Sequence, residues 1–139
     1  MKDIKFKVFG EDITISPQKM LENAGNSLFV NIQQVYKDFM YVGQLHAKMV
    51  SERDTLRITM EAIEGKRYNE LKVGGYQALY GTKSTEDALS RTLCEDANVI
   101  KARKDHIRAC MITGELGVLK RSLEMRMEAL KEISDKHLS

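Results

Sequence analysis

Residues 16–64 read SPQKMLENAGNSLFVNIQQVYKDFMYVGQLHAKMVSERDTLRITMEAIE. Apolar residues recur there at alternating spacings of four and three, which keeps one seam on one side of a helix. The seam contains Leu21, Gly25, Leu28, Ile32, Val35, Phe39, Val42, His46, Met49, Arg53, Leu56, Met60 and Ile63. Phe29, Tyr36 and Val50 widen it. The pattern predicts one helix over residues 16–65, begun by Ser16 and Pro17 and ended by Gly65.

A helix of that length is roughly 70 Å long, which exceeds the width of a small domain. Its broad apolar side has to be buried against other long helices, from this chain or from sister chains. The sequence therefore favours self-association. His46 and Arg53 are the polar positions of the seam, where a polar side chain fixes register or oligomeric state at some cost in stability.

Composition limits the remaining possibilities. The 139 residues suffice for a single helical domain over 1–139, and the net charge of +2 is slight. We expect no membrane-spanning segment and no signal peptide, hence a cytoplasmic protein without a membrane partner. Cys94 and Cys110 lack C-x-x-C spacing and are interpreted as reduced, small core residues of helices.

Three segments flank the long helix. Within residues 1–15, the stretch from Lys5 to Ile15 alternates apolar and polar side chains on both sides of Phe9-Gly10-Glu11-Asp12, which predicts a short β-hairpin. Residues 66–83 form a connector in which Gly74-Gly75 suits a tight hairpin turn. Residues 84–138 form a second helical region, opened at Ser84 and broken near Gly114–Gly117. The predicted fold is mainly α, with two long helical regions forming a helical hairpin or bundle.

The second helical region has a sparser seam. Its predicted members are Leu89, Leu93, Ile100 and Ile107, followed by Ile112, Leu116, Leu119, Leu123, Leu130 and Ile133. Lys101, Lys104 and Arg108 share one helix face and, with Arg103, form the densest basic cluster of the chain.

The connector mixes basic and aromatic side chains. It contains Lys66, Arg67, Lys72 and Lys83 with Tyr68, Tyr76 and Tyr80. Cations neutralise phosphates and tyrosine rings stack on unpaired bases, so the mixture suits single-stranded nucleic acid. Composition alone favours the other interpretation, a solvated connector whose tyrosines cover the ends of helices.

No catalytic motif is recognisable. The sequence has no glycine-rich phosphate loop followed by lysine, no nucleophile–histidine–carboxylate grouping in a known motif, and no metal-ligand spacing. We therefore expect no catalytic residue, no metal and no cofactor, and hence not an enzyme.

Two blocks of the chain resemble the UvsY-type recombination mediator proteins of bacteriophages. The first, Ile15 to Lys66, has the Ile15-x-x-x-Lys19 start, Ala24 with Asn26, and the ending Gly65-Lys66. The second runs from Leu93 to Ile133. It contains Asp96-x-x-Val99-Ile100-Lys101 and Arg126-x-x-Ala129-Leu130-Lys131-x-Ile133.

The resemblance implies a small helical protein that assembles into a ring in the bacterial host cytoplasm. Such mediators bind single-stranded DNA, loosen the single-strand-binding protein and help a RecA-like recombinase to load. The family's Leu-Lys-Ala-Arg-like DNA-contact run corresponds here to Leu56-Arg57-Ile58-Thr59, in which Thr59 replaces one of the two basic residues. A closer literal match, Ile100-Lys101-Ala102-Arg103, lies in the second block, out of the family's order.

Two hypotheses follow. The first is a non-enzymatic single-stranded DNA-binding mediator that contacts DNA through Arg57, Lys66 and Arg67, with Lys101, Lys104 and Arg108 as a second patch. The alternative is an oligomeric, phage-encoded protein-interaction factor, an inhibitor or sponge that sequesters a host protein or a small signalling molecule.

Overall fold

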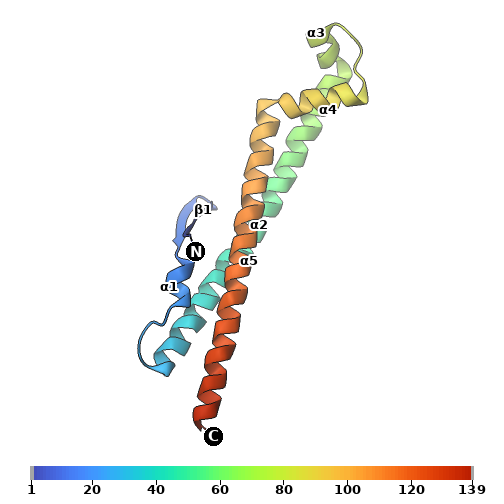
Figure 1. The fold of residues 1–139 in the computed structure, drawn as a ribbon. Helices are drawn as coiled ribbons and strands as arrows, with labels where there is room; N and C mark the ends of the chain where they lie inside the picture. Colours follow the sequence, from blue (N-terminus) through green and yellow to red (C-terminus); the bar gives the residue numbers. More distant parts are fainter. Residues whose placement is uncertain (1, 139) are drawn as a thin grey trace. The chain divides into compact units, whose positions relative to one another are not determined.

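The computed structural model describes residues 2–138. The chain is mainly helical, with two long helices and an N-terminal β-hairpin, which confirms the predicted fold class (Figure 1). The elements are β1 (Ile4–Val8), β2 (Glu11–Ile15), α1 (Pro17–Leu21), α2 (Leu28–Glu70), the π-helical η1 (Leu71–Gly75), α3 (Tyr76–Tyr80), α4 (Glu86–Glu95) and α5 (Ala97–Leu138). None of these helices is long and apolar enough to cross a membrane, within residues 2–138.

The N-terminal hairpin follows the predicted alternation. β1 and β2 pair antiparallel, with Ile4 opposite Ile15 and Val8 opposite Glu11. Phe9 and Gly10 connect them with φ of 46° and 80°, the conformation of a two-residue turn that matches strand twist. Ile4, Val8 and Ile15 are buried, and the Phe9 amide donates to Glu52 Oε1 of α2 over 3.4 Å.

The helix predicted over residues 16–65 begins where expected, but it is interrupted after Leu21 and continues past Gly65. α1 begins at Pro17, as expected, but stops at Leu21, and α2 starts only at Leu28. The intervening residues are rich in Asn, Gly and Ser, whose side chains compete with helical hydrogen bonds. The buried Asn31 side chain fixes this turn, because its Oδ1 accepts from the Gly25 amide over 3.0 Å.

At its other end α2 passes through Gly65 and reaches Glu70. The predicted connector 66–83 is therefore largely helical, and the predicted hairpin turn at Gly74-Gly75 is absent. Instead the helix kinks inside η1, where Gly74 has φ 129°. Only glycine adopts this backbone conformation readily, which explains the kink at this residue. Gly81, with φ 73°, ends α3.

The second helical region has its break at Asp96, not near Gly114–Gly117. α4 begins after Thr85, one residue beyond the predicted Ser84, and Thr85 Oγ1 accepts from the Ala88 amide over 3.2 Å. Asp96 Oδ1 accepts from the amides of Asn98 and Val99, over 2.9 and 3.1 Å, and so caps α5.

α5 runs unbroken from Ala97 to Leu138, so the break predicted near Gly114–Gly117 is wrong. A glycine inside a helix costs about 1 kcal/mol, which the burial of Leu116, Leu119 and Leu123 outweighs. Gly117 also allows close approach of two helices, because a Cβ there would lie 3.4 Å from His46 Nε2 of α2.

The chain forms two compact units. The first contains the N-terminal residues up to Glu52 and the C-terminal residues from Met111, and the second contains Arg53–Cys110. The first unit has an apolar core in which α2 contributes Val35, Val42, Leu45 and Met49, and α5 contributes Leu116, Leu119, Leu123 and Leu130. Each such side chain contributes about 1.5–3 kcal/mol relative to exposure.

The seam of the second unit differs from the prediction. Leu71, Leu89, Val99, Ala102 and Ala109 are its buried apolar residues, whereas the predicted seam residues Ile100 and Ile107 are exposed. Leu89 is buried as predicted. On α5 the predicted phase is displaced, because Val99 and Ala102, and not Ile100 and Ile107, are the buried side chains. The expected burial of Cys94 and Cys110 is also wrong, since both thiols are exposed.

Candidate nucleic-acid interface

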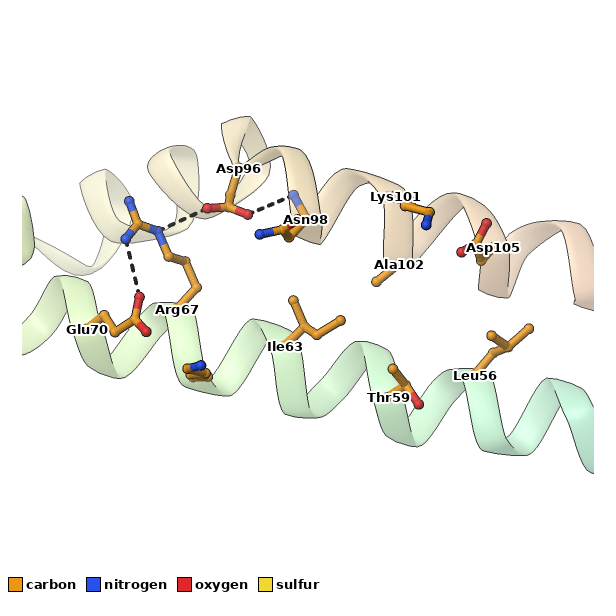
Figure 2. Close-up of a pocket in the computed structure, with 11 residues that line it drawn as sticks. Leu56, Thr59, Ile63, Arg67, Glu70, Asp96, Asn98, Lys101, Ala102 and Asp105 are labelled. Carbon is orange, nitrogen blue, oxygen red and sulfur yellow. Dashed lines mark hydrogen bonds and ion pairs between the residues drawn. The ribbon is translucent and has the colours of Figure 1, made fainter.

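The second unit contains a groove between α2 and α5 (Figure 2). Its volume is about 580 Å³. The lining residues are Leu56, Thr59, Ile63, Lys66, Arg67, Glu70, Asp96, Asn98, Lys101, Ala102 and Asp105. The groove therefore brings together members of both basic patches that the sequence suggested: Lys66 and Arg67 from α2, and Lys101 from α5.

Arg67 has a structural role in this groove. Its Nε lies 3.0 Å from Asp96 Oδ2 and its Nη1 lies 3.4 Å from Glu70 Oε2. Nε is buried and its N–H makes no hydrogen bond, so the contact with Asp96 is an ion pair only. Since Asp96 also caps α5, Arg67 holds the α4–α5 corner against α2.

Arg103 is engaged in the same way. Its Nε donates to Glu64 Oε1 of α2 over 2.6 Å, and its Nη1 lies 3.2 Å from Cys94 Sγ. The hydrogen bond to Glu64, followed by the contact with Cys94, raises the pKa of Arg103 above its ordinary value. The guanidinium thus stays charged and joins three helical segments of the second unit.

The other predicted DNA contacts are not held by carboxylates in the way that Arg67 and Arg103 are. Arg57, Lys66, Lys101, Lys104 and Arg108 are all exposed. Within residues 2–136, none of them forms an ion pair with a carboxylate. These five cations are therefore available to an external anion, whereas Arg67 and Arg103 are not.

The structure does not bring all six predicted residues together. Lys101, Lys104 and Arg108 lie at helical spacing on one flank of α5, and Lys101 faces the groove. Arg57 and Lys66 are nine residues apart on α2, which is about two and a half turns, so they project from opposite sides. Arg57 is outside the groove. We call Lys66, Lys101, Lys104 and Arg108 the basic flank.

The groove is lined by charged, amide and apolar side chains. Its lining residues include no histidine and no cysteine, and its one hydroxyl, on Thr59, donates to the Thr55 carbonyl over 3.0 Å. Three carboxylates, on Glu70, Asp96 and Asp105, balance its three cations. No group of three metal-ligating side chains occurs within the described part of the chain.

The three connector tyrosines differ in their surroundings. The Tyr68 hydroxyl donates to Glu86, with 2.8 and 2.9 Å to its two carboxylate oxygens, and this hydrogen bond raises the pKa of Tyr68. Tyr68 therefore ties α2 to α4, as the connector interpretation expects. Tyr76 and Tyr80 instead pair with each other, with ring centroids 4.7 Å apart, and Tyr80 is 53% exposed.

Lys72 and Lys83 belong to the basic and aromatic mixture of the connector, although they were not among the six predicted DNA contacts. Lys72, Lys83 and Ser84 line a second pocket of the same unit, together with the glycine of the kink. The signal in the sequence was the mixture of lysines and tyrosines in residues 66–83, which a solvated connector also explained. Comparisons with known protein families, with curated proteins and with solved structures found no match.

Proposed function

We propose that the protein is a non-enzymatic, single-stranded DNA-binding protein that acts as a recombination mediator. The observation that supports it is the contrast among the basic residues of the second unit. Arg67 and Arg103 are neutralised by carboxylates, while the basic flank and Arg57 carry exposed charge without an ion pair within residues 2–136. Unpaired cations at helical spacing follow a phosphate backbone without reading base sequence.

Binding is tested by the fluorescence anisotropy of a labelled oligothymidylate over a series of salt concentrations. The variant Lys101→Gln/Lys104→Gln/Arg108→Gln is expected to lower the slope of log K against log salt by about 2, at roughly 0.7 for each phosphate that is no longer neutralised. The matched control is Lys37→Gln/Lys48→Gln/Lys131→Gln, which removes the same charge from the first unit. Equal slopes for both variants, or no binding by the unchanged protein at low salt, would contradict the proposal.

The mediator role requires a second experiment. A RecA-like recombinase is added to DNA coated with single-strand-binding protein, and filament formation is followed with and without the protein. Faster loading is the expected result, and the Lys101→Gln/Lys104→Gln/Arg108→Gln variant should not produce it. If the protein binds DNA but has no effect on recombinase loading, it is a DNA-binding protein and not a mediator.

The proposal includes self-association through the first unit. Met111, Val118 and Met125 recur every seven residues on α5 and are 62%, 66% and 62% exposed. Val118 lies about 200° around the helix from the buried Leu116, so this outer stripe faces away from the core. On α2, Phe29 and Tyr36 are exposed in the same way. A seven-residue repeat is typical of a surface covered by another helix, which a second copy supplies.

A second candidate function rests on the same stripe. If the helix that covers it belongs to another protein, the chain is a protein-interaction factor, an inhibitor or sponge. Light scattering of the purified protein, with and without an oligonucleotide, separates the two functions. An oligomer that binds DNA and that Val118→Glu/Met125→Glu dissociates supports the mediator, whereas a protein indifferent to DNA, in any oligomeric state, supports the interaction factor.

A further inference from the structure

The kink inside η1 forms a pocket of about 370 Å³ in the second unit. Its polar lining residues are Lys72, Gln77, Lys83 and Ser84. No carboxylate lines it, in contrast to the groove between α2 and α5, where three carboxylates balance three cations. This kink pocket therefore combines two positive charges with an amide and a hydroxyl, which is the chemistry that holds a phosphate group.

Both lysines are free to meet an anion. Neither forms an ion pair within residues 2–136, and Lys72 Nζ lies 5.8 Å from the centroid of the Tyr68 ring. Two acidic residues, Glu86 and Asp87, are in the first turn of α4, next along the chain. Glu86 accepts a hydrogen bond from the Tyr68 hydroxyl, which orients its carboxylate without cancelling its charge. Neither Glu86 nor Asp87 lines the kink pocket.

An aromatic side chain belongs to the same kink. α3 consists of five residues, and it carries Gln77, which lines the pocket, between Tyr76 and Tyr80. Tyr80 is 53% exposed, and Leu79 beside it is 61% exposed. Tyr80 packs against Tyr76, with ring centroids 4.7 Å apart, and 53% of its surface stays exposed. An exposed ring beside a cationic pocket is the arrangement used for unpaired nucleotides.

We propose that the kink pocket binds one phosphate of a single-stranded nucleic acid, held by Lys72 and Lys83, while Tyr80 stacks on a neighbouring unpaired base. The inference rests on the proposed DNA binding and adds a second contact region to the basic flank. The kink at Gly74 places Lys72 and α3 around one pocket.

The test uses the full chain, a labelled oligothymidylate and anisotropy measured over a range of salt. Lys72→Gln/Lys83→Gln should lower the slope of log K against log salt by about 1.4, because two cations no longer displace counterions from the strand. Tyr80→Ala should weaken binding about 5- to 150-fold at one salt concentration while leaving the slope unchanged. Tyr80→Phe, which keeps the ring, should bind like the unchanged protein.

An abasic oligonucleotide of the same length separates stacking from phosphate binding. The weakening caused by Tyr80→Ala should vanish on the abasic strand, and the effect of Lys72→Gln/Lys83→Gln should persist. The control Lys37→Gln/Lys48→Gln removes two charges from the first unit and should change the slope less. Circular dichroism of each variant confirms that it is folded.

The outcomes distinguish this inference from the proposed function. If the unchanged protein binds no oligonucleotide, both fail. If it binds, and neither the Lys72→Gln/Lys83→Gln variant nor Tyr80→Ala changes the binding, only the kink pocket is wrong. If free thymidine monophosphate binds as tightly as the oligonucleotide and depends on the same residues, the pocket is a site for a small nucleotide and the inference for a strand is overturned.

Discussion

Between Val35 and Met49, α2 buries four apolar side chains in the first unit. From Arg53 to Glu70 the same helix, described from end to end, buries none, and it meets its neighbours in the second unit through Glu64–Arg103 and Arg67–Asp96 instead. Apolar burial contributes about 1.5–3 kcal/mol for each large side chain, while a partly exposed ion pair contributes about 1 kcal/mol or less. The comparison indicates that α2 contributes more to stability through the first unit than through the second, where more of its charged surface stays exposed.

The largest expected change in the free energy of unfolding comes from comparing one substitution in each unit. Leu123 of α5 is fully buried in the first unit, so Leu123→Ala should cost about 2–5 kcal/mol. Leu56 lines the open groove of the second unit and is only half-buried, so Leu56→Ala should cost less than about 1.5 kcal/mol. Urea denaturation measures both. Equal destabilisation would show that the two units are packed alike.

Two glycines of the second unit give the next largest effect. A Cβ at Gly75 would lie 2.7 Å from the Glu70 carbonyl oxygen, and that backbone atom cannot move cheaply. Gly75→Ala should therefore destabilise the protein by about 1–3 kcal/mol.

Gly65 is the matched control, because nothing lies within 4 Å of a Cβ there and the residue is inside α2. Gly65→Ala should stabilise by about 0.5–1 kcal/mol. Thermal unfolding followed by circular dichroism measures both changes. Similar destabilisation at the two sites would mean that the helix does end at Gly65, as its sequence suggested.

A smaller effect is expected at the Glu64–Arg103 ion pair. Both side chains are partly exposed, at 25% and 35%, so solvent screens the interaction despite the 2.6 Å separation. A double-mutant cycle with Glu64→Gln and Arg103→Gln should give a coupling energy of about 0.2–1 kcal/mol.

The neighbouring pair Arg53–Asp54, with 3.5 Å between Nη2 and Oδ1, is the control and should couple more weakly. A Glu64–Arg103 coupling above about 3 kcal/mol is the size seen when a buried pair is broken. Such a value would mean that ion pairs, and not only the first unit's core, hold the molecule together.

The smallest effect concerns Asp38 of α2, in the first unit. Burial raises the pKa of Asp38, and the hydrogen bond from Gln34 Nε2, at 3.1 Å, partly offsets the rise. The folded carboxyl therefore holds its proton more tightly than the unfolded one, so its contribution to stability is present at low pH and is lost as pH rises through the folded pKa.

Asp38→Asn removes that dependence. The variant should gain stability relative to the unchanged protein as pH rises from about 3 to 7, by a few tenths of a kcal/mol because the carboxyl is partly solvated. Urea denaturation at both pH values measures it. Gln34→Ala is the companion variant, and it should enlarge the pH dependence because it removes the hydrogen bond that lowers the pKa of Asp38.

Much of the fold was predictable because periodicity is local. The alternation around Phe9-Gly10 predicted the hairpin, and the apolar spacing of Val35, Val42 and Met49 predicted the seam of α2. The turn before α2 was also present in the sequence, as the Asn- and Gly-rich stretch between Leu21 and Leu28. The apolar seam continues in phase across this stretch, and this periodicity led to the prediction of one continuous helix.

The candidate site was less predictable. The sequence marked Arg57, Lys66 and Arg67 as one patch, but helical geometry separates Arg57 from Lys66, and Arg67 is neutralised by Asp96. Whether a cation is free depends on a carboxylate far along the chain, as Glu64 and Arg103 illustrate. Spacing within one helix carries no information about such a partner.

By itself the sequence determined the N-terminal hairpin, the two long helical regions, their order and the apolar face of α2, since these follow from a residue's nearest neighbours along the chain. Only the tertiary structure decided that α5 passes through Gly114 and Gly117, that Gly74 kinks the chain, and which cations remain unpaired. Those outcomes depend on contacts between segments distant in sequence, where burial and ion pairing outweigh the preference of any single residue.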